Sequence, residues 1–380
     1  MQLKRWLRPM AVGMGLCAAS SPTPAAPLSL DEQTPATMLR YFTDSDHVAV
    51  RSLMGDYALS LRSGVELNVH WNNERVRIPA IDAPIGSPEA VDAITTASRP
   101  IAGNAFQDFI KIRNEFQGGV SRGGAAVDYY HSSEKDYFAR QLGARYHRDF
   151  MNEQMNLAVG TSYGWDTIEP LDDDDTNTAA DAKTTFHWNA VATQVLSPST
   201  MVRMGIEYNI VDGLQHNPYR NVYAGGSIVP ERHPEHRERR DAFLKLNHYL
   251  DNRSSFKLNY RFYTDDWGIA SHEMGSKLNQ YITRGLFAGY QYRWYTQNSA
   301  DFYRDAYTTV DGIGGHRSGD YRMAELSSHL FGFALNFDLE ALAADHPALA
   351  RMGVWFNVER YFNSNNYSAN ILETGLDFRF

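Results

Sequence analysis

The chain has 380 residues, of which 43% are hydrophobic and 21% are charged, and its formal net charge at pH 7 is -9. No segment after the N-terminus approaches the roughly 20 consecutive apolar residues that a membrane-spanning helix needs, so a helical membrane protein is excluded. Carboxylates (45) outnumber Lys and Arg (36), which argues against a general nucleic-acid binder. Aromatic residues make up 13% of the chain, a share that suits a membrane barrel with aromatic girdles.

The N-terminus predicts an export signal over residues 1–25, because a basic start is followed by a short apolar segment and then by small residues. Cys17 suggests a lipoprotein, but Leu16 before it is bulkier than the residue usual at that position. Removal of the signal leaves a mature chain without cysteine, so disulfides do not stabilise it. We expect a short periplasmic segment at 26–36 and a barrel at 37–380.

Apolar and polar residues alternate with period two through most of the mature chain, and this places them on opposite faces of strands. The pattern is clear at 202–210, 256–262 and 372–380. A soluble sandwich and a transmembrane barrel can both produce it. Sandwich strands usually have about 5 or 6 residues, whereas these segments have about ten or more and end in aromatic residues, as barrel strands do at membrane interfaces. The pattern therefore favours an all-β, antiparallel, transmembrane outer-membrane β-barrel.

Short and long connections alternate along the chain, as periplasmic turns and extracellular loops do in such barrels. With both ends of the barrel in the periplasm, the count is about sixteen strands, and an inner connection at 340–350 has the composition of one or two helical turns. Short connections are expected near 62–63, 118–124, 149–154, 197–200, 251–254 and 283–285, and the longest loops near 80–105, 166–183, 212–239 and 299–321.

Three short motifs resemble a known bacterial family. They are Tyr-Thr-Asp-Asp-Trp-Gly at 263–268, Ser-Ala-Asp-Phe-Tyr at 299–303 and Leu-Ser-Pro at 196–198. In these motifs the chain is similar to the domain-of-unknown-function family 3570, whose members are predicted outer-membrane barrels of uncharacterised function. The segment 80–105 matches less well. The resemblance implies the fold and the outer membrane of a Gram-negative bacterium, and it supplies no catalytic residues.

The terminal Phe380 ends a strand in which Phe and Leu alternate with polar residues. It resembles the signal that the barrel-assembly machinery reads, although a strand that ends with an aromatic residue at the interface would look the same. The expected partners are this machinery and the lipid of the outer membrane.

Charged residues of both signs fall on the predicted lumen face. They favour either a pore or solute-binding channel with a modest preference for anions, or an interior closed by ion pairs. The pore-lining candidates are Lys111, Arg113, Arg145, Arg203, Glu207, Lys257, Arg261, Arg293, Glu359 and Arg379, with Lys245 and Lys277 on the same face.

Two other polar clusters are weaker candidates for chemistry. The run Asp172, Asp173, Asp174 and Asp175 offers the oxygen ligands that calcium prefers, but its spacing matches no EF-hand. His216, His233 and His236 could ligate a transition metal, although a solvated rim that contacts lipid phosphates fits a charged Pro-containing segment better. The pair Asp265 and Asp266 with Trp267 predicts a turn that closes an external hairpin and sets a ring at the interface.

Ser and His occur side by side at 131–133 and 327–329, but neighbours in a strand alternate faces, and no nucleophile-elbow motif is present. We therefore expect no enzyme and no cofactor, and an outer-membrane hydrolase is the weakest alternative. The favoured function is a porin-like channel or binding protein for small polar solutes. The main alternative is a non-conducting scaffold that holds a periplasmic or surface protein partner, conceivably a redox protein.

Overall fold

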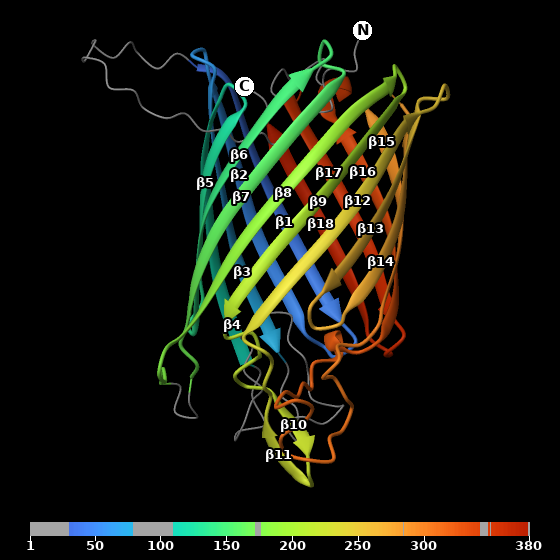
Figure 1. The fold of residues 1–380 in the computed structure, drawn as a ribbon. Helices are drawn as coiled ribbons and strands as arrows, with labels where there is room; N and C mark the ends of the chain where they lie inside the picture. Colours follow the sequence, from blue (N-terminus) through green and yellow to red (C-terminus); the bar gives the residue numbers. More distant parts are fainter. Residues whose placement is uncertain are drawn as a thin grey trace, which may run out of the picture.

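The computed structural model describes residues 30–78, 109–171, 176–283, 285–342, 349 and 351–378. Within these residues sixteen antiparallel strands close into one barrel, and β10 and β11 form a separate hairpin (Figure 1). The predicted fold class and strand number are confirmed. The barrel strands are β1 (Leu30–Asp44), β2 (Ala49–Leu61), β3 (Val65–Ile78), β4 (Phe109–Arg122), β5 (Ala125–Ser133), β6 (Tyr137–Phe150), β7 (Met155–Ile168), β8 (Asp181–Ser197), β9 (Thr200–Gly213), β12 (His236–Tyr249), β13 (Ser254–Asp265), β14 (Ala270–Tyr281), β15 (Leu286–Gln297), β16 (Leu326–Asp338), β17 (Met352–Asn363) and β18 (Ser368–Phe378).

Strand β1 starts earlier than expected. It begins at Leu30 and pairs with β2 over almost its whole length, so that most of the segment assigned to a periplasmic extension at 26–36 belongs to the barrel wall. Pro35 lies in this strand opposite Tyr57, and a proline without an N–H weakens the strand signal in a sequence. The predicted signal at 1–25 lies outside the described residues.

Short turns join the strands at one end of the barrel, and the long loops lie at the other end (Figure 1). The turn between β4 and β5 needs glycine, because Gly124 has φ +85° and a Cβ there would lie 2.4 Å from the carbonyl oxygen of His147. The inner connection after β16 does form a 3-10 turn, η3 (Leu339–Leu342). Since β1 starts opposite the end of β2, the barrel begins at the short-turn end, as periplasmic termini require.

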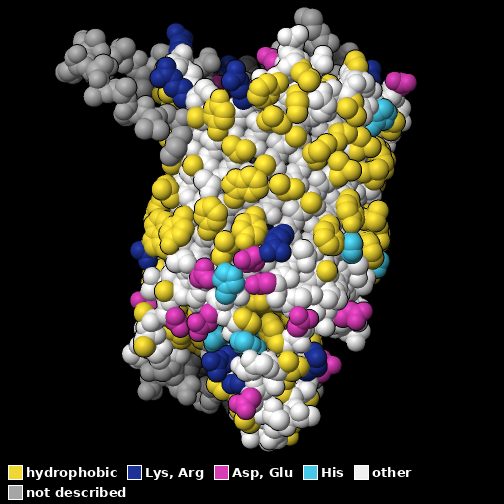
Figure 2. Space-filling model, viewed as in Figure 1, with side chains coloured by type: hydrophobic (Ala, Val, Ile, Leu, Met, Phe, Trp, Pro, Cys, Tyr) yellow, Lys and Arg dark blue, Asp and Glu magenta, His cyan; other side chains and the backbone are white. Residues whose placement is uncertain are grey.

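The outer wall is apolar. Leu39, Ile112, Ile206 and Phe331 are each more than half exposed although they lie in the middle of strands, and Figure 2 shows hydrophobic side chains spread over the barrel wall. Below this belt in the figure, toward the long loops, charged and His side chains gather. A soluble sandwich would bury such side chains, whereas a membrane barrel turns them to lipid. Among the described residues, no helix is both long and apolar enough to cross a bilayer.

Two long loops fold against each other beyond the barrel mouth (Figure 1). The first loop carries the hairpin of β10 (Asn221–Ala224) and β11 (Ser227–Pro230), and the second follows β15 and contains the 3-10 turn η2 (Tyr321–Met323). Isolated bridges join Ala224 to Tyr307 and Arg232 to Arg317. The loops therefore form one structured unit, and this unit places η2 at the mouth of the lumen.

Candidate solute-binding site in the barrel lumen

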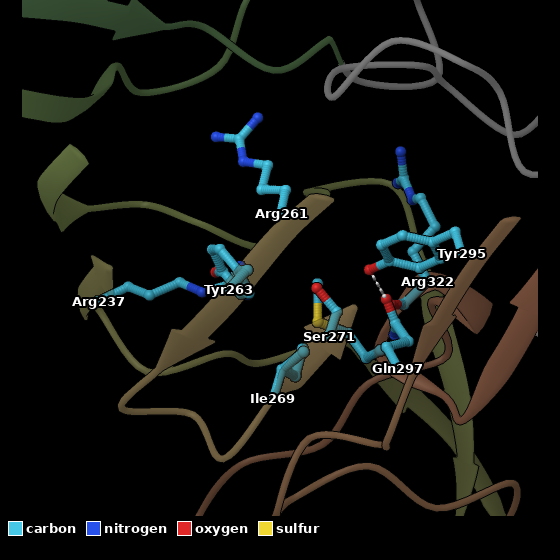
Figure 3. Close-up of a pocket in the computed structure, with 9 residues that line it drawn as sticks. Arg237, Arg261, Tyr263, Ile269, Ser271, Tyr295, Gln297 and Arg322 are labelled. Atoms are coloured by element: carbon cyan, nitrogen blue, oxygen red, sulfur yellow. Dashed lines mark hydrogen bonds between the residues drawn. The ribbon is translucent and has the colours of Figure 1, made fainter. Parts of the chain in front are cut away.

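A cavity of about 270 Å³ lies where the lumen meets the long loops. Its walls come from four neighbouring strands and from η2 (Figure 3). Three guanidinium groups, several hydroxyl and amide groups and two apolar side chains line it, so the cavity is basic and of mixed polarity. The lining residues are Arg237, Arg261, Tyr263, Ile269, Ser271, Tyr295, Gln297, Arg322 and Met323.

The turn after β13 fixes one side of this cavity. One carboxylate oxygen of Asp265 accepts hydrogen bonds from the backbone N–H groups of Trp267 (3.1 Å) and Ile269 (2.9 Å). Its other oxygen accepts from Arg237 Nε (2.9 Å) and from the Tyr263 hydroxyl (2.7 Å). Asp265 thus holds the turn and the Arg237 guanidinium together.

Trp267 closes the predicted external hairpin, but its position at the membrane interface was predicted wrongly. The ring is only 4% exposed. It packs edge-on against Phe302 at 5.3 Å between ring centroids, and the Arg237 guanidinium lies 4.1 Å from its centroid. Its indole N–H donates to the carbonyl oxygen of His236 (2.9 Å). The second loop covers the turn. Because this contact joins segments that are far apart in the chain, it produces no local pattern of apolar residues from which the burial of Trp267 could be predicted.

The second loop supplies Arg322 and Met323 through η2. Asp320 caps this turn, and both of its carboxylate oxygens accept from Arg322 Nε (2.9 and 3.1 Å). Burial alone would raise the pKa of Asp320, but the attraction of Arg322 and Arg220 outweighs it and holds this pKa well below its usual range. Gln297 fixes η2 to β15 by donating to the carbonyl oxygens of Arg322 and Ala324, both at 2.8 Å.

Glu231 joins the two loops from a fully buried position. It accepts from the Ser318 hydroxyl (2.6 Å) and the Gly319 N–H (3.0 Å), and it pairs with Arg220 (3.6 Å). Burial acts to raise the pKa of Glu231, yet the hydrogen bond from His233 and the charges of His233 and Arg220 lower it overall.

His233, Ser318 and Glu231 do not form a hydrolytic triad. His233 Nε2 meets both the Ser318 hydroxyl oxygen (2.9 Å) and Glu231 (3.1 Å), and Ser318 is completely buried. A triad needs the acid on the other ring nitrogen and an accessible hydroxyl. Of the histidines suggested as metal ligands, His216 and His233 pack edge-on with their ring centroids 6.2 Å apart, whereas His236 is an exposed partner of Asp212. Among the described residues, no group of three His, Cys, Asp or Glu side chains is arranged to hold a metal ion.

On the same wall of the lumen the predicted cations meet acids. Arg261 lies between Asp241 (2.7 Å) and Glu207 (3.2 Å), and Arg293 lies 3.7 Å from Glu273. Sequence reasoning proposed Arg261, Arg293 and Glu207 but missed Asp241 and Glu273. Strand parity could have revealed them, because Asp241 lies four residues before Lys245 and so shares its face.

Three predicted lumen cations on β4 and β6 are held in ion pairs. Lys111 is buried and bridges Glu134 and Asp136 at the mouth. Two further pairs lie deeper: Arg113 contacts Glu115 (2.6 Å), and Arg145 contacts Asp128 (3.2 Å). Glu359 accepts a hydrogen bond from Asn357 (3.3 Å). This part of the lumen matches the alternative in which ion pairs occupy the interior.

One part of the lumen wall differs in that its described cations form no ion pairs. Arg203, Lys245, Lys257 and Lys277 lie on the lumen face toward the short-turn end, where Arg203 is paired in register with Lys245 and Lys257 with Lys277. Within the described part of the chain, none of the four forms an ion pair with an acid. We call these residues the basic wall. Arg379, Phe380 and the run Asp172 to Asp175 lie outside the described residues.

Together, the closed strand order, the apolar exterior and the charged interior define a barrel of the Gram-negative outer membrane with a polar lumen. The family described as "Protein of unknown function (DUF3570)" matches residues 122–345. The match covers more than half of the chain, and the protein belongs to this family.

The chain is also similar to several solved structures at low identity. A loop-deletion mutant of OmpT, an outer membrane protein of Vibrio cholerae, is 8% identical, with 93% of this chain and 99% of that chain covered and a TM-score of 0.45. OpdK of Pseudomonas aeruginosa, crystallised with vanillate, is 9% identical over 92% and 98%, with a TM-score of 0.43. A bacterial polysaccharide outer membrane secretin is 8% identical over 92% and 98%, with a TM-score of 0.49. None of the curated proteins matches the sequence.

Proposed function

We propose that the barrel is a porin-like channel for small polar solutes and that it prefers anions. The basic wall carries this proposal. Like charges directly opposite each other across two strands destabilise a sheet, and here two such pairs face the lumen without an ion pair to any described acid. Rings or rows of Arg and Lys lower the barrier for negative solutes, so an anion in transit would be attracted to these residues.

The cavity at the mouth supports the same proposal. Arg237, Arg261 and Arg322 approach it from three different elements, and each is also held by a carboxylate. Such pairs position a guanidinium, and its remaining N–H groups can still donate to a solute. The hydroxyl groups of Tyr263, Ser271 and Tyr295 complete a lining that suits a small carboxylate or phosphate.

The basic wall lies toward the short-turn end of β9, β12, β13 and β14. Acids of the same strands, Glu207, Asp241 and Glu273, lie nearer the mouth, where they pair with Arg261 and Arg293. A barrel of sixteen strands is wide enough for an aqueous channel.

Single-channel recording of the refolded protein in a planar bilayer tests the proposal. We expect stable conductance steps and, across a potassium chloride gradient, a reversal potential of the sign that chloride preference gives. When a small carboxylate such as acetate is added at equal ionic strength, we expect the channels still to carry current. A protein that is verified as folded but carries no current contradicts the proposal.

A second candidate is the scaffold that holds a surface partner. The hairpin β10–β11 projects from the loop end (Figure 1), and its Tyr223 and Ile228 are 54% and 56% exposed. Val310 of the second loop, 46% exposed, lies beside this hairpin at Gly225. Exposed apolar side chains on a structured tip are typical of a protein contact. Two results together would favour this function: the folded barrel carries no current, and it binds a surface partner whose binding is abolished by Tyr223→Ser and Ile228→Ser.

A further inference from the structure

Three arginines lie on the outer wall of the barrel at its loop end. Arg51 of β2 and Arg75 of β3 are directly paired in register, and Arg77 follows on the same face of β3. All three are exposed. Side chains of the alternate positions, such as Ser52 and Val76, are buried on the inner side, so the arginines face away from the lumen.

Arg51 and Arg75 lie directly opposite each other. Within the described part of the chain neither of these two forms an ion pair, and the Arg51 guanidinium lies 5.8 Å from the ring centroid of Tyr41. No outward-facing residue on the loop-side halves of β1 to β4 is acidic. Directly opposed like charges destabilise the sheet unless an anion lies between them.

Apolar side chains flank the arginines. Ile112, 51% exposed, is the register partner of Arg75, and Ile110, 43% exposed, is the partner of Arg77. Toward the middle of the barrel the exposed, hydrogen-bonded pair Asn73 and Asn114 comes next on this face, with the exposed apolar side chains of Leu53 and Trp71 beside and beyond it. A ligand of this site must therefore present an anionic group to the arginines and hydrocarbon to the residues beside and below them.

We propose that Arg51 and Arg75 bind the phosphate of an outer-leaflet lipid, with Tyr41, Ile110 and Ile112 against its acyl chains. The long loops of a barrel lie on the external side, where the lipid of a Gram-negative outer membrane carries phosphate groups on its sugar headgroup. Guanidinium groups hold phosphate by paired hydrogen bonds, and basic clusters at the membrane surface are a general means of recognising anionic lipid. A free phosphate would use the arginines but not the apolar flank.

Native mass spectrometry and thermal unfolding of the full-length barrel in a neutral detergent test this proposal. The probes are bis-phosphorylated lipid A, the same lipid A with its phosphates removed, and inorganic phosphate. The test variant is Arg51→Gln with Arg75→Gln. The control is Arg122→Gln, which removes an exposed arginine from the outer wall at the opposite, short-turn end.

We expect bis-phosphorylated lipid A to remain bound to the wild type and to the control and to raise their unfolding temperature. The double variant should bind it roughly tenfold or more weakly, and it should fold at least as well in its absence because the opposed charges are gone. Equal binding of the double variant overturns the proposal, as does equal binding of dephosphorylated lipid A. A stabilisation that inorganic phosphate alone reproduces also overturns it, since the site would then be one for free phosphate.

Discussion

Lys257 of β13 lies directly opposite Lys277 of β14 on the lumen face, and no described acid pairs with either of them. A Cβ at Gly289 would lie 3.5 Å from Cε of Lys277, so glycine leaves space beside this side chain. The two charges repel each other, and both side chains lie on the lumen face.

Removing one of these charges should therefore stabilise the barrel. For Lys257→Gln we expect the free energy of unfolding in urea, measured in lipid vesicles, to rise by up to about 1 kcal/mol. Arg261→Gln is the contrasting variant, because Arg261 lies between two acids and its loss should destabilise. A clear loss of stability in Lys257→Gln would show that the lysine pair has partners that compensate it.

The loop unit should depend on the buried carboxylate of Glu231. Glu231→Gln removes the charge that Arg220 and His233 face, and it weakens the hydrogen bonds from Ser318 and Gly319. We expect the opening free energy of segments 214–235 and 299–325 to fall by about 1–3 kcal/mol, measured by hydrogen exchange, while the barrel strands stay protected. The exposed Glu235→Gln serves as the control and should change nothing. Equal protection of both variants would contradict the assigned role of Glu231.

The same loops should open in acid. Glu231 and Asp320 have pKa values lowered below the usual ones, so the stability that they contribute is present above the ordinary carboxyl range and is lost as the pH falls through the lowered values. We expect the loop unit to remain protected at pH 5 and 7 and to lose protection as the pH falls from about 4 toward 2. Hydrogen exchange corrected for the intrinsic rate measures this, with the barrel strands as internal reference. A loss of protection that begins above pH 6 would indicate that protonation of a histidine, and not of these carboxylates, opens the loops.

Asp265 should control the position of Arg237 at the mouth. Asp265→Asn leaves the buried guanidinium without its counter-charge, and breaking such a pair costs about 3 kcal/mol or more. We expect local exposure of Trp267, seen as a red shift of fluorescence, and a changed conductance. The neighbouring Asp266→Asn is the matched control, because Asp266 is exposed and accepts from the Glu238 N–H. The two variants behaving alike would contradict this role.

Much of the barrel could be predicted from the sequence, because the position and facing of each strand depend on residues that are close together in the chain. Period two places Lys257 and Arg261 on one face whatever their partners are, and turn residues mark the strand ends. The start of β1 was missed because Pro35 interrupts the strand pattern. The burial of Trp267 and the network around Glu231 depend on contacts between segments that are far apart in the chain, such as Ser318 with Glu231, and no local pattern encodes them.

Ion selectivity tests the central claim most directly. The measurement is the reversal potential of single channels across a potassium chloride gradient, for the wild type, for Lys257→Gln with Lys277→Gln, and for Arg122→Gln on the outer wall. We predict chloride preference in the wild type and in the outer-wall variant, and a shift toward zero or cation preference in the double variant. A reversal potential that is the same in all three would contradict a lumen in which the basic wall selects the solute.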